Sequence, residues 1–384
     1  MKTLDSIDVK GKVVLVRVDL NSSVVKGKVF DSPRFKAHSE TIKELKKKKA
    51  KVIILAHQGR PGNKDFLGLK KHARILNKYV KVKFVGDVIG KKALRAISEL
   101  KNGDALLLDN VRKLKEEFKP SNRNKLVKVL SKVSDIYVQD AFSVVHRNQT
   151  SVVSFPKSLP PYVGRTLERE LKSLSKLKAS GKKSVYLVGG IKIGEEFSLI
   201  EKAIKENKTV LTGGYLGSLC LIAKGYDVGS LSKVLRKKGE YKYLSKIKKY
   251  IKSGKLVSPI DIAVSINGKR KELSLSALPT DYPILDIGKK TVGLYKDYLR
   301  KANFVVIRGA PGYAELKNFR WGTEQLLRAI ASSNSFSIMG GGSLSTIVKE
   351  LRINTKRFSY ISLAGGAFVR YLAGERLPGL EVLK

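Results

Sequence analysis

Short, continuous runs of apolar residues, many of them β-branched, recur along both halves of the chain and constrain its fold more than any other feature. Each run is uninterrupted rather than alternating, as in parallel strands that are covered on both faces. Charged amphipathic stretches separate the runs, and strand–helix–strand repeats build parallel sheets. The runs are VVLVRV at 13–18, VIILA at 52–56, ALLLD at 105–109 and DIYVQD at 135–140, then SVYLVGG at 184–190, TVLTGG at 209–214, FVVIRG at 304–309, FSIMGGG at 336–342 and YISLAGG at 360–366.

The length of 384 residues favours two domains over one. Between the halves, SFPKSLPPYVG at 154–164 carries three prolines and predicts a linker. The next stretch places Leu167, Leu171, Leu174 and Leu177 at helical spacing. We therefore predict an α/β protein with two doubly wound parallel-sheet (Rossmann-like) domains joined by a helix.

The chain is strongly basic, with 77 Lys and Arg against 33 Asp and Glu, a formal net charge of +44. Such a charge attracts polyanions, so nucleic acid is a possible partner. The lysines are nevertheless spread along the chain without a single block, which favours solvated helix faces.

One cysteine, Cys220, and an N-terminus without an apolar signal region predict a reducing, cytoplasmic location. No long apolar segment predicts a membrane span.

The predicted strand ends differ between the two halves, and ligands of open α/β sheets bind at these ends. In the first half they carry charged and polar residues, and arginine offers bidentate hydrogen bonds to carboxylate and phosphate. In the second half they carry glycines, which let backbone N–H groups approach a phosphate. The first set is Asp19, Asn21, His57, Arg60, Arg112, Asp140, His146 and Arg147; the second is Gly189, Gly190, Gly213, Gly214, Gly309, Gly340, Gly341, Gly342, Gly365 and Gly366.

A glycine half that holds a nucleotide and an arginine half that holds a small anion suit phosphoryl transfer, which needs positioning and positive charge more than covalent chemistry. The sequence has no G-x-x-x-x-G-K-[ST] motif, and no G-x-G-x-x-G follows a strand, which argues against a P-loop enzyme or a dinucleotide dehydrogenase. His38 and His72 lie in helical stretches without a partner motif, so we interpret them as structural.

The motifs VLVRVDLN, HQGRPG, LLLDNVR, DAFSVVHRNQTS, GGIKIGEE, ILDIGKKT and GGGSLS resemble phosphoglycerate kinases, in order and along nearly the whole chain. HRNQTS, and GGIK without a second lysine, resemble the archaeal branch. The resemblance implies a hinge-bending bilobal kinase of glycolysis and gluconeogenesis. It implies an N-terminal domain of 1–162 plus 370–384, a linker helix of 163–178 and a nucleotide-binding domain of 179–369.

The same resemblance implies the ligands: 3-phosphoglycerate or 1,3-bisphosphoglycerate, and ATP or ADP carrying Mg²⁺, with no metal held by the protein alone and a monomeric enzyme. It implies that Arg34 and Lys192 stabilise the transferring phosphoryl group, with Gly365 and Gly366 donating N–H groups. The acid would be bound by Asp19, Asn21, Arg34, His57, Gly59, Arg60, Arg112 and Arg147. The nucleotide would be bound by Gly189, Gly190, Lys192, Gly213, Gly214, Glu315, Gly340, Gly341, Gly342 and Ser343.

Four positions depart from the pattern of the family. Glu196 stands where a second lysine is usual, and Ser343 replaces a magnesium-binding aspartate. On either side of Gly309, Arg308 replaces an asparagine and Ala310 replaces a proline. The loss of positive charge at Glu196 predicts weaker triphosphate binding unless another cation substitutes. Two alternatives stay open: a former kinase fold that acts as a basic nucleic-acid-binding protein, and a kinase for a related acyl phosphate or carboxylate.

Overall fold

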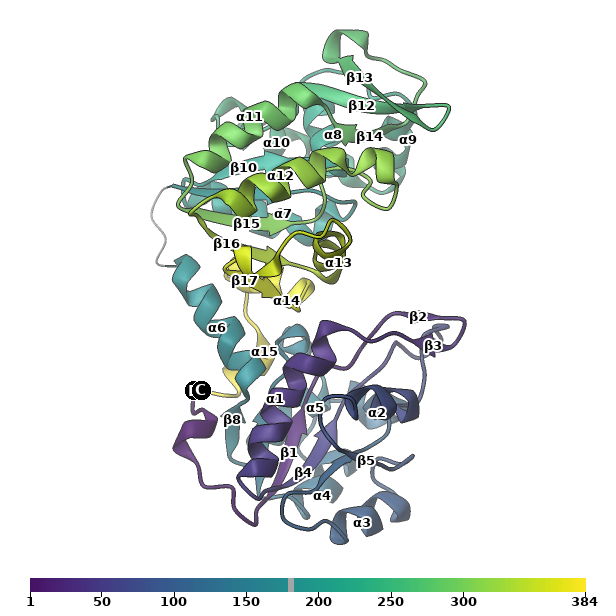
Figure 1. Cartoon of the computed structure of the whole chain (residues 1–384), viewed down its shortest axis with the longest axis vertical. Coiled ribbons are helices and arrows are strands. Elements are labelled where there is room, and N and C mark those ends of the chain that lie inside the picture. Colours follow the sequence, from purple (N-terminus) through teal and green to yellow (C-terminus); the bar gives the residue numbers. More distant parts are fainter. Residues whose placement is uncertain (179–182) are drawn as a thin grey trace. The chain divides into compact units, whose positions relative to one another are not determined.

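The computed structural model describes residues 1–178 and 183–384, which form two compact units (Figure 1). Unit 1 comprises Met1–Lys172 and Arg376–Lys384, and unit 2 comprises Ser173–Glu375. The division falls inside helix α6 (Arg165–Lys178). Residues 179–182, with which the predicted nucleotide-binding domain begins, lie outside the described residues.

Unit 1 is built on a parallel six-stranded sheet with the order β5-β6-β4-β1-β7-β8. The direction of strand addition reverses beside β1, because β4 pairs on one side of it and β7 on the other. The four strands predicted for this half are present as β1, β4, β6 and β7. The strands are β1 (Val13–Arg17), β4 (Lys51–Leu55), β5 (Lys83–Phe84), β6 (Ala105–Leu107), β7 (Ile136–Gln139) and β8 (Pro161–Val163).

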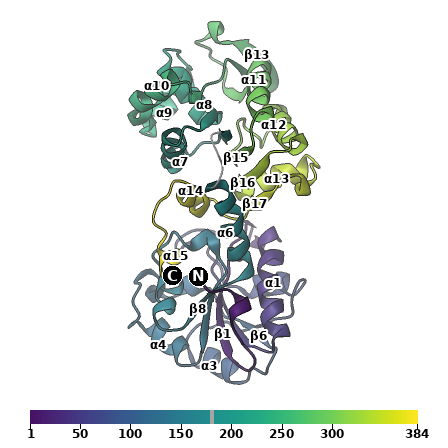
Figure 2. The same ribbon diagram turned by 90° about the vertical axis from the view of Figure 1, so that its left-hand side faces the viewer.

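Helices cover both faces of this sheet, and Figure 2 shows α1 and α4 on opposite faces. Proline at the first position of α1 suits a helix start, since its missing N–H would have no partner there. Asn124 caps α4 by accepting a hydrogen bond from the Val127 N–H. The helices are α1 (Pro33–Lys47), α2 (Lys70–Leu76), α3 (Lys91–Ser98), α4 (Lys125–Ser131), α5 (Thr150–Val153) and α15 (Pro378–Glu381). The 3₁₀ turns are η1 (Leu4–Ser6), η2 (Val111–Lys113), η3 (Lys115–Phe118), η4 (Phe142–Val144) and η5 (Phe155–Lys157). Strands β2 (Val24–Val25) and β3 (Lys28–Val29) form a separate hairpin.

The proline-rich segment 154–164 is part of unit 1 rather than the linker that its composition predicts. It contains η5 and β8, and β8 pairs in parallel with β7. Pro161 is the first residue of this edge strand. Proline is tolerated at this position because its missing N–H interrupts no hydrogen bonds between central strands. The C-terminal segment Arg376–Lys384 also belongs to unit 1, where the Gly379 N–H donates to the Val145 carbonyl at 2.8 Å.

Unit 2 repeats the architecture with a parallel sheet in the order β11-β10-β9-β15-β16-β17. Figures 1 and 2 show α11, α12 and α13 on one side of this sheet and α7, α8 and α10 on the other. All five strands predicted for this half are present. The strands are β9 (Ser184–Val188), β10 (Thr209–Thr212), β11 (Leu256–Val257), β15 (Phe304–Arg308), β16 (Phe336–Gly340) and β17 (Tyr360–Ser362).

The helices of this unit are α7 (Ile193–Lys205), α8 (Gly214–Ala223), α9 (Ser230–Lys237), α10 (Leu244–Lys252), α11 (Lys289–Arg300), α12 (Trp321–Ser332), α13 (Gly342–Glu350) and α14 (Gly366–Leu372), with 3₁₀ turns η6 (Glu240–Tyr243), η7 (Leu275–Ala277), η8 (Lys317–Phe319) and η9 (Thr355–Arg357). An additional antiparallel sheet, β13-β12-β14, is inserted between β11 and α11. Its strands are β12 (Asp261–Ile266), β13 (Lys269–Ser274) and β14 (Ile284–Ile287).

Each unit has its own apolar core. In unit 1 the inward residues of β1, β4 and β7 pack against Phe35, Ile42 and Leu45 of α1. In unit 2 the central strands pack against α11, α12 and α13. Among the described residues, no helix is both long and apolar enough to cross a membrane.

Candidate active site

The charged strand-end residues of unit 1 form one connected group. Asp19 follows β1, His57 and Gly59 follow β4, and Arg112 lies in η2 after β6. Parallel strands bring these ends to one edge of the sheet, beside the point where strand addition reverses. The unit thus gathers residues distant in the sequence, as the strand-end pattern predicts.

Asp19 anchors the first part of this group. Its carboxylate lies 3.3 Å from Arg34 Nε of α1 and accepts hydrogen bonds from the Asn21 N–H at 2.9 Å and from the Ser143 hydroxyl. Arg34 also donates to the Asn21 carbonyl. Burial opposes ionisation of Asp19, but the charge of Arg34 and the hydrogen bond from the Ser143 hydroxyl outweigh it and hold the pKa of Asp19 well below its usual range. The carboxylate is therefore permanently charged and fixes the guanidinium of Arg34.

Arg112 anchors the second part. Its side chain donates to the Gly59 carbonyl at 2.5 Å and to Gln149 Oε1 at 3.4 Å, and Asn21 Oδ1 accepts from the Gly59 N–H at 2.9 Å. The Nε atoms of Arg112 and Arg147 are buried, and neither has a hydrogen-bond partner in the described part of the chain. Buried donors without partners are costly. Their presence on two neighbouring arginines indicates a site for an anion.

The electrostatics of the group agree with that reading. Burial, followed by the charges of Arg147 and Arg17, lowers the pKa of Arg112 to about 9. Burial, followed by the charge of Arg60, lowers the pKa of Arg147. Both groups remain protonated at neutral pH but repel one another. An anion bound among them relieves this repulsion, so the cluster is matched to a ligand with several negative charges.

Arg17 is a member of this group that the sequence analysis did not identify, because it lies within the predicted strand at 13–18. Its side chain is fully buried. It donates to Ser151 Oγ at 2.9 Å and to the Val18 carbonyl, and its second terminal nitrogen lies 3.1 Å from His57 Nδ1. The Ser151 hydroxyl in turn donates to Glu117 Oε1 at 2.7 Å. Buried Arg17 thus connects the anion site to the buried carboxylate of Glu117.

Arg17 also determines the state of His57. Burial, and then the charge of Arg17, lowers the pKa of His57 well below its ordinary value, so the imidazole is neutral near pH 7. An arginine can only donate, and therefore His57 Nδ1 accepts from Arg17 and the ring proton resides on Nε2. The Nε2–H group remains as a donor for a ligand.

His38 and His72, which the sequence analysis interprets as structural, each have a buried hydrogen-bond partner. His38 Nδ1 lies 2.6 Å from Asp140 Oδ2, and His72 Nε2 lies 2.9 Å from Gln58 Oε1. Asp140 further accepts from the Thr41 hydroxyl and from the Thr166 N–H at the start of α6. This strand-end carboxylate therefore connects α1 with α6 rather than serving the anion site.

In unit 2 the paired glycines after β9 and β10 allow the backbone to approach closely. The N–H groups of Gly189 and Gly190 donate to the carbonyls of Arg308 and Ala310 at 2.8 Å, and the Gly214 N–H donates to the Pro311 carbonyl at 2.7 Å. A Cβ on Gly189 would lie 2.4 Å from the Ala310 carbonyl oxygen, and one on Gly213 would lie 2.6 Å from Pro311. The sequence analysis gave the wrong physical reason for Gly189, Gly190 and Gly214, because their amides are already used by backbone carbonyls.

The turn after β16 is different. Gly341, with a φ of 114°, is the N-cap of α13, and Gly342 is its first residue. The first amides of a helix have no partner within the helix, and its dipole favours an anion at this end. Gly340 also lies against Phe368 of α14, since a Cβ there would be 2.4 Å from the ring. Ser343 lies in the first turn of α13, and its side chain is outside the described part of the structure.

The remaining predicted residues of unit 2 lie at strand ends or in loops of the same sheet. Lys192 is the N-cap of α7, and its exposed ammonium lies 3.1 Å from Glu195 Oε1. Glu315 is exposed in the loop after β15, next to the exposed Leu316. Gly365 and Gly366 join β17 to α14. Glu196, in the first turn of α7, is buried beside Arg308 at the end of β15.

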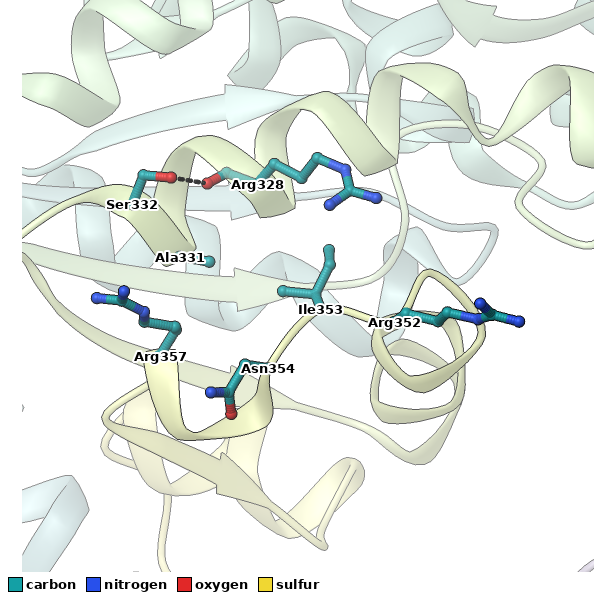
Figure 3. Close-up of a pocket in the computed structure, with 7 residues that line it drawn as sticks. All are labelled: Arg328, Ala331, Ser332, Arg352, Ile353, Asn354 and Arg357. Atoms are coloured by element: carbon teal, nitrogen blue, oxygen red, sulfur yellow. Dashed lines mark hydrogen bonds between the residues drawn. The ribbon is translucent and has the colours of Figure 1, made fainter.

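A separate pocket of about 400 Å³ in unit 2 has Ile353 and three arginines, Arg328, Arg352 and Arg357, among its lining residues. Figure 3 shows the guanidinium groups of Arg328 and Arg352 pointing in one direction and that of Arg357 in the other. Arg328 also contacts Glu324 at 2.8 Å. Because these cations do not converge, the pocket lacks the geometry of the anion site in unit 1.

No group of three or more His, Cys, Asp or Glu side chains is arranged to hold a metal ion in residues 1–178 and 183–384.

Comparison with known proteins identifies the family. The family model described as phosphoglycerate kinase matches residues 4–375. Phosphoglycerate kinase of Methanothermus fervidus is 39% identical over 100% of this chain and 96% of its own length, and that of Sulfurisphaera tokodaii is 38% identical over 99% and 95%. The crystal structure of phosphoglycerate kinase from Pyrococcus horikoshii superimposes with a TM-score of 0.93 at 35% identity, covering 100% of this chain and 98% of that one.

These relatives are archaeal, as the sequence motifs predict, and the likeness extends over both units. The structure of the Coxiella burnetii enzyme is also similar, with a TM-score of 0.84 at 28% identity. The matches support an enzyme that transfers phosphoryl groups to a carboxyl acceptor and give no support to the nucleic-acid-binding alternative. The chain belongs to the phosphoglycerate kinase family.

Proposed function

We propose that the chain transfers a phosphoryl group reversibly between 1,3-bisphosphoglycerate with ADP and 3-phosphoglycerate with ATP, and that unit 1 binds the three-carbon acid. The observation that supports this most directly is the pair of buried Nε donors on Arg112 and Arg147. A phosphorylated carboxylic acid supplies several acceptor oxygens and enough negative charge for such a cluster. The acid-binding residues are Asp19, Asn21, Arg34, His57, Gly59, Arg60, Arg112 and Arg147.

These residues divide the work by chemical type. Arg112, Arg147 and Arg60 provide charge for phosphate or carboxylate, and the Nε2–H of His57 provides a directed donor. Asp19 cannot bind an anion directly, since its carboxylate is ionised, but it holds Arg34 and suits a hydroxyl of the substrate as acceptor. The site therefore favours an acid with a hydroxyl group between its two charged ends.

Unit 2 binds the nucleotide in this proposal. Gly189, Gly213 and Gly214 pack closely against the backbone of Gly190, Ala310 and Pro311. Together with Gly190 they would lie beside the adenosine. Glu315 accepts from the ribose hydroxyls. The amides of Gly340, Gly341, Gly342 and Ser343 donate to the phosphates at the start of α13, where the helix dipole adds to their effect.

Catalysis is electrostatic. In the direction of ATP use, a carboxylate oxygen of 3-phosphoglycerate attacks the γ-phosphorus, and the bond to the leaving oxygen of ADP breaks. No proton moves, so no general base is needed. Arg34, Lys192 and the N–H groups of Gly365 and Gly366 stabilise the charge on the moving group. Lys192 must first leave Glu195, an exposed contact that costs little to break.

Magnesium enters this scheme with the nucleotide. It would neutralise phosphate charge, and its remaining ligands would be water. We further propose a monomeric enzyme in the cytoplasm, which the family implies.

The test titrates 3-phosphoglycerate and ADP separately into the wild type and into Arg112→Met. We expect the substitution to weaken 3-phosphoglycerate binding by about 10- to 100-fold, because charge-assisted hydrogen bonds are lost, and to leave ADP binding unchanged. Arg95→Met is the matched control, since Arg95 is exposed and pairs with Glu99 within α3. Unchanged 3-phosphoglycerate binding in Arg112→Met would contradict the site, and equal competition by other phosphorylated acids would contradict the substrate.

A further inference from the structure

Two positions at which the chain departs from the family motifs contact each other in unit 2. Glu196 lies in the first turn of α7, and Arg308 is the last residue of β15. Arg308 Nε lies 3.1 Å from Glu196 Oε1, and both side chains are largely buried. The inference drawn below rests on the proposed function, since it concerns a residue of the same nucleotide site.

The guanidinium of Arg308 lies between two of the glycine turns. One terminal nitrogen donates to the Gly340 carbonyl at 3.3 Å. A Cβ on Gly341 would lie 2.6 Å from this nitrogen, and one on Gly365 would lie 3.7 Å from the other. The group therefore occupies the space between the N-terminus of α13 and the turn that follows β17.

The fold places this position at the ligand-binding edge of the sheet. β15 pairs with β9 on one side and with β16 on the other. From β9 the chain adds β10 and β11 on one side and β15 to β17 on the other, so the order reverses between β9 and β15. Ligands of open α/β sheets bind at the carboxyl ends of strands beside such a reversal. Arg308 ends the strand at that point.

The side chain also has unused donors. An arginine carries five N–H groups. Among the described residues, this guanidinium donates a hydrogen bond only to the Gly340 carbonyl, and its buried Nε lacks a well-aligned partner. A cation that is mostly buried, held beside a helix N-terminus and left with free donors suits the phosphates of a nucleotide.

We propose that Arg308 binds the nucleotide phosphates in place of the lysine that position 196 lacks, and that Glu196 is a positioning residue that holds the guanidinium toward the turn of Gly340 and Gly341. The positive charge is thus supplied from β15 rather than from α7. The positive charge that is missing at position 196 is therefore compensated by the positive charge at position 308.

The protonation of Glu196 is consistent with this exchange. Burial raises the pKa of Glu196 to about 8, with Glu195 acting in the same direction and Arg308 and Lys192 opposing it. Near neutral pH a large share of the carboxyl groups is therefore protonated. A neutral Glu196 still contacts Arg308 but does not cancel its charge, which stays available to the phosphates.

The test compares Arg308→Asn, Glu196→Lys with Arg308→Asn, and the control Arg300→Asn by calorimetric titration with ADP and with adenosine. Arg300 is exposed and contacts Asp297 on α11, outside this cluster. We expect Arg308→Asn to weaken ADP binding by about 10- to 100-fold with adenosine binding unchanged, because only the phosphate contact is lost. The double variant should recover most of the affinity, and Arg300→Asn should match the wild type.

Three results would overturn the inference: ADP binding by Arg308→Asn within about twofold of the wild type, an equal loss for ADP and adenosine, or a double variant no better than Arg308→Asn. Thermal unfolding verifies that each variant is folded. If Arg308→Asn does not fold, Arg308→Gln removes the charge with a longer side chain, and an ADP affinity equal to that of the wild type would again overturn the inference. A wild-type protein that binds neither ADP nor adenosine would instead refute the proposed function.

Discussion

Replacing Arg17 with methionine tests the buried network that supports the anion site. The substitution keeps an unbranched side chain of similar length but removes the charge and every N–H donor. Glu117 loses the positive charge to which it is linked through the Ser151 hydroxyl. His57 Nδ1 loses the donor that fixes its tautomer. Both groups remain buried.

The expected cost follows from what is left behind. Breaking a buried ionic network by removing one partner typically destabilises a protein by about 3–5 kcal/mol. A buried acceptor without a donor, such as His57 Nδ1, contributes about 1–3 kcal/mol of that cost. Burial already raises the pKa of Glu117, with Arg17 opposing, so in Arg17→Met this carboxyl should take up a proton. We therefore expect a loss of about 3–5 kcal/mol at neutral pH.

The assay is urea unfolding followed by far-ultraviolet circular dichroism. The single tryptophan, Trp321, lies in α12 of unit 2, so its fluorescence reports on the other unit and serves as an internal control. Adding Glu117→Gln to Arg17→Met removes the carboxyl group that has lost its cationic partner. The double variant should therefore recover at least about 1 kcal/mol of the free energy of unfolding. A loss below about 1 kcal/mol for Arg17→Met, or strictly additive effects in the double variant, would refute the reasoning.

Three further predictions follow from other contacts. Arg34→Ala should lower turnover by about 10³-fold with nucleotide affinity unchanged, measured by steady-state kinetics and ADP titration; retained turnover would contradict the role of Arg34 at the transferring group. Gly309→Ala should lower the free energy of unfolding, measured with urea, by at least about 2 kcal/mol more than Gly254→Ala does. Both glycines have a positive φ, but only a Cβ on Gly309 would meet a backbone oxygen, that of Gly189, at 2.1 Å. Equal losses in the two variants would disprove the packing argument. The pKa of Glu196 rises from 4.5 to about 8 on folding, so the folded protein binds more protons between these values and its free energy of unfolding should fall as pH rises through that window, by up to about 1.4 kcal/mol per pH unit. Glu196→Gln should remove this slope, and parallel pH profiles for the two proteins would contradict it.

The strands of both main sheets were predictable where burial on both faces gives a continuous apolar run. Strands β5, β8 and β11 were not, because their residues lie outside such a run and pair only through the tertiary fold. β8 is such a case, and the prolines of 154–164 suggested a linker instead. The inserted sheet had a usable signal: Asn267 and Gly268, with φ of 50° and 76°, form the turn of the β12–β13 hairpin.

The candidate site was predictable to the extent that function follows position at a strand end. Asp19, His57 and Arg112 satisfy that rule. Arg17 does not, because it lies within a strand and its partners Ser151 and Glu117 come from distant parts of the chain. The fold alone revealed that these residues meet.

The pairing of Glu196 with Arg308 illustrates the same limit. Read alone, the missing lysine at position 196 predicted weaker triphosphate binding, and Arg308 was noted only as the replacement of an asparagine. Their contact depends on the pairing of β9 with β15, which the sequence does not specify. A charge lost on one element and gained on its neighbour can be recognised only once both are placed in the sheet.

The measurement that tests the central claim most directly is magnesium-dependent phosphoryl transfer from ATP to 3-phosphoglycerate, with the acyl phosphate trapped by hydroxylamine. The wild type should form the hydroxamate only when ATP, 3-phosphoglycerate and Mg²⁺ are all present. Arg112→Met should need a far higher concentration of 3-phosphoglycerate to reach the same rate of hydroxamate formation. A folded protein that binds ADP but forms no hydroxamate would contradict the account.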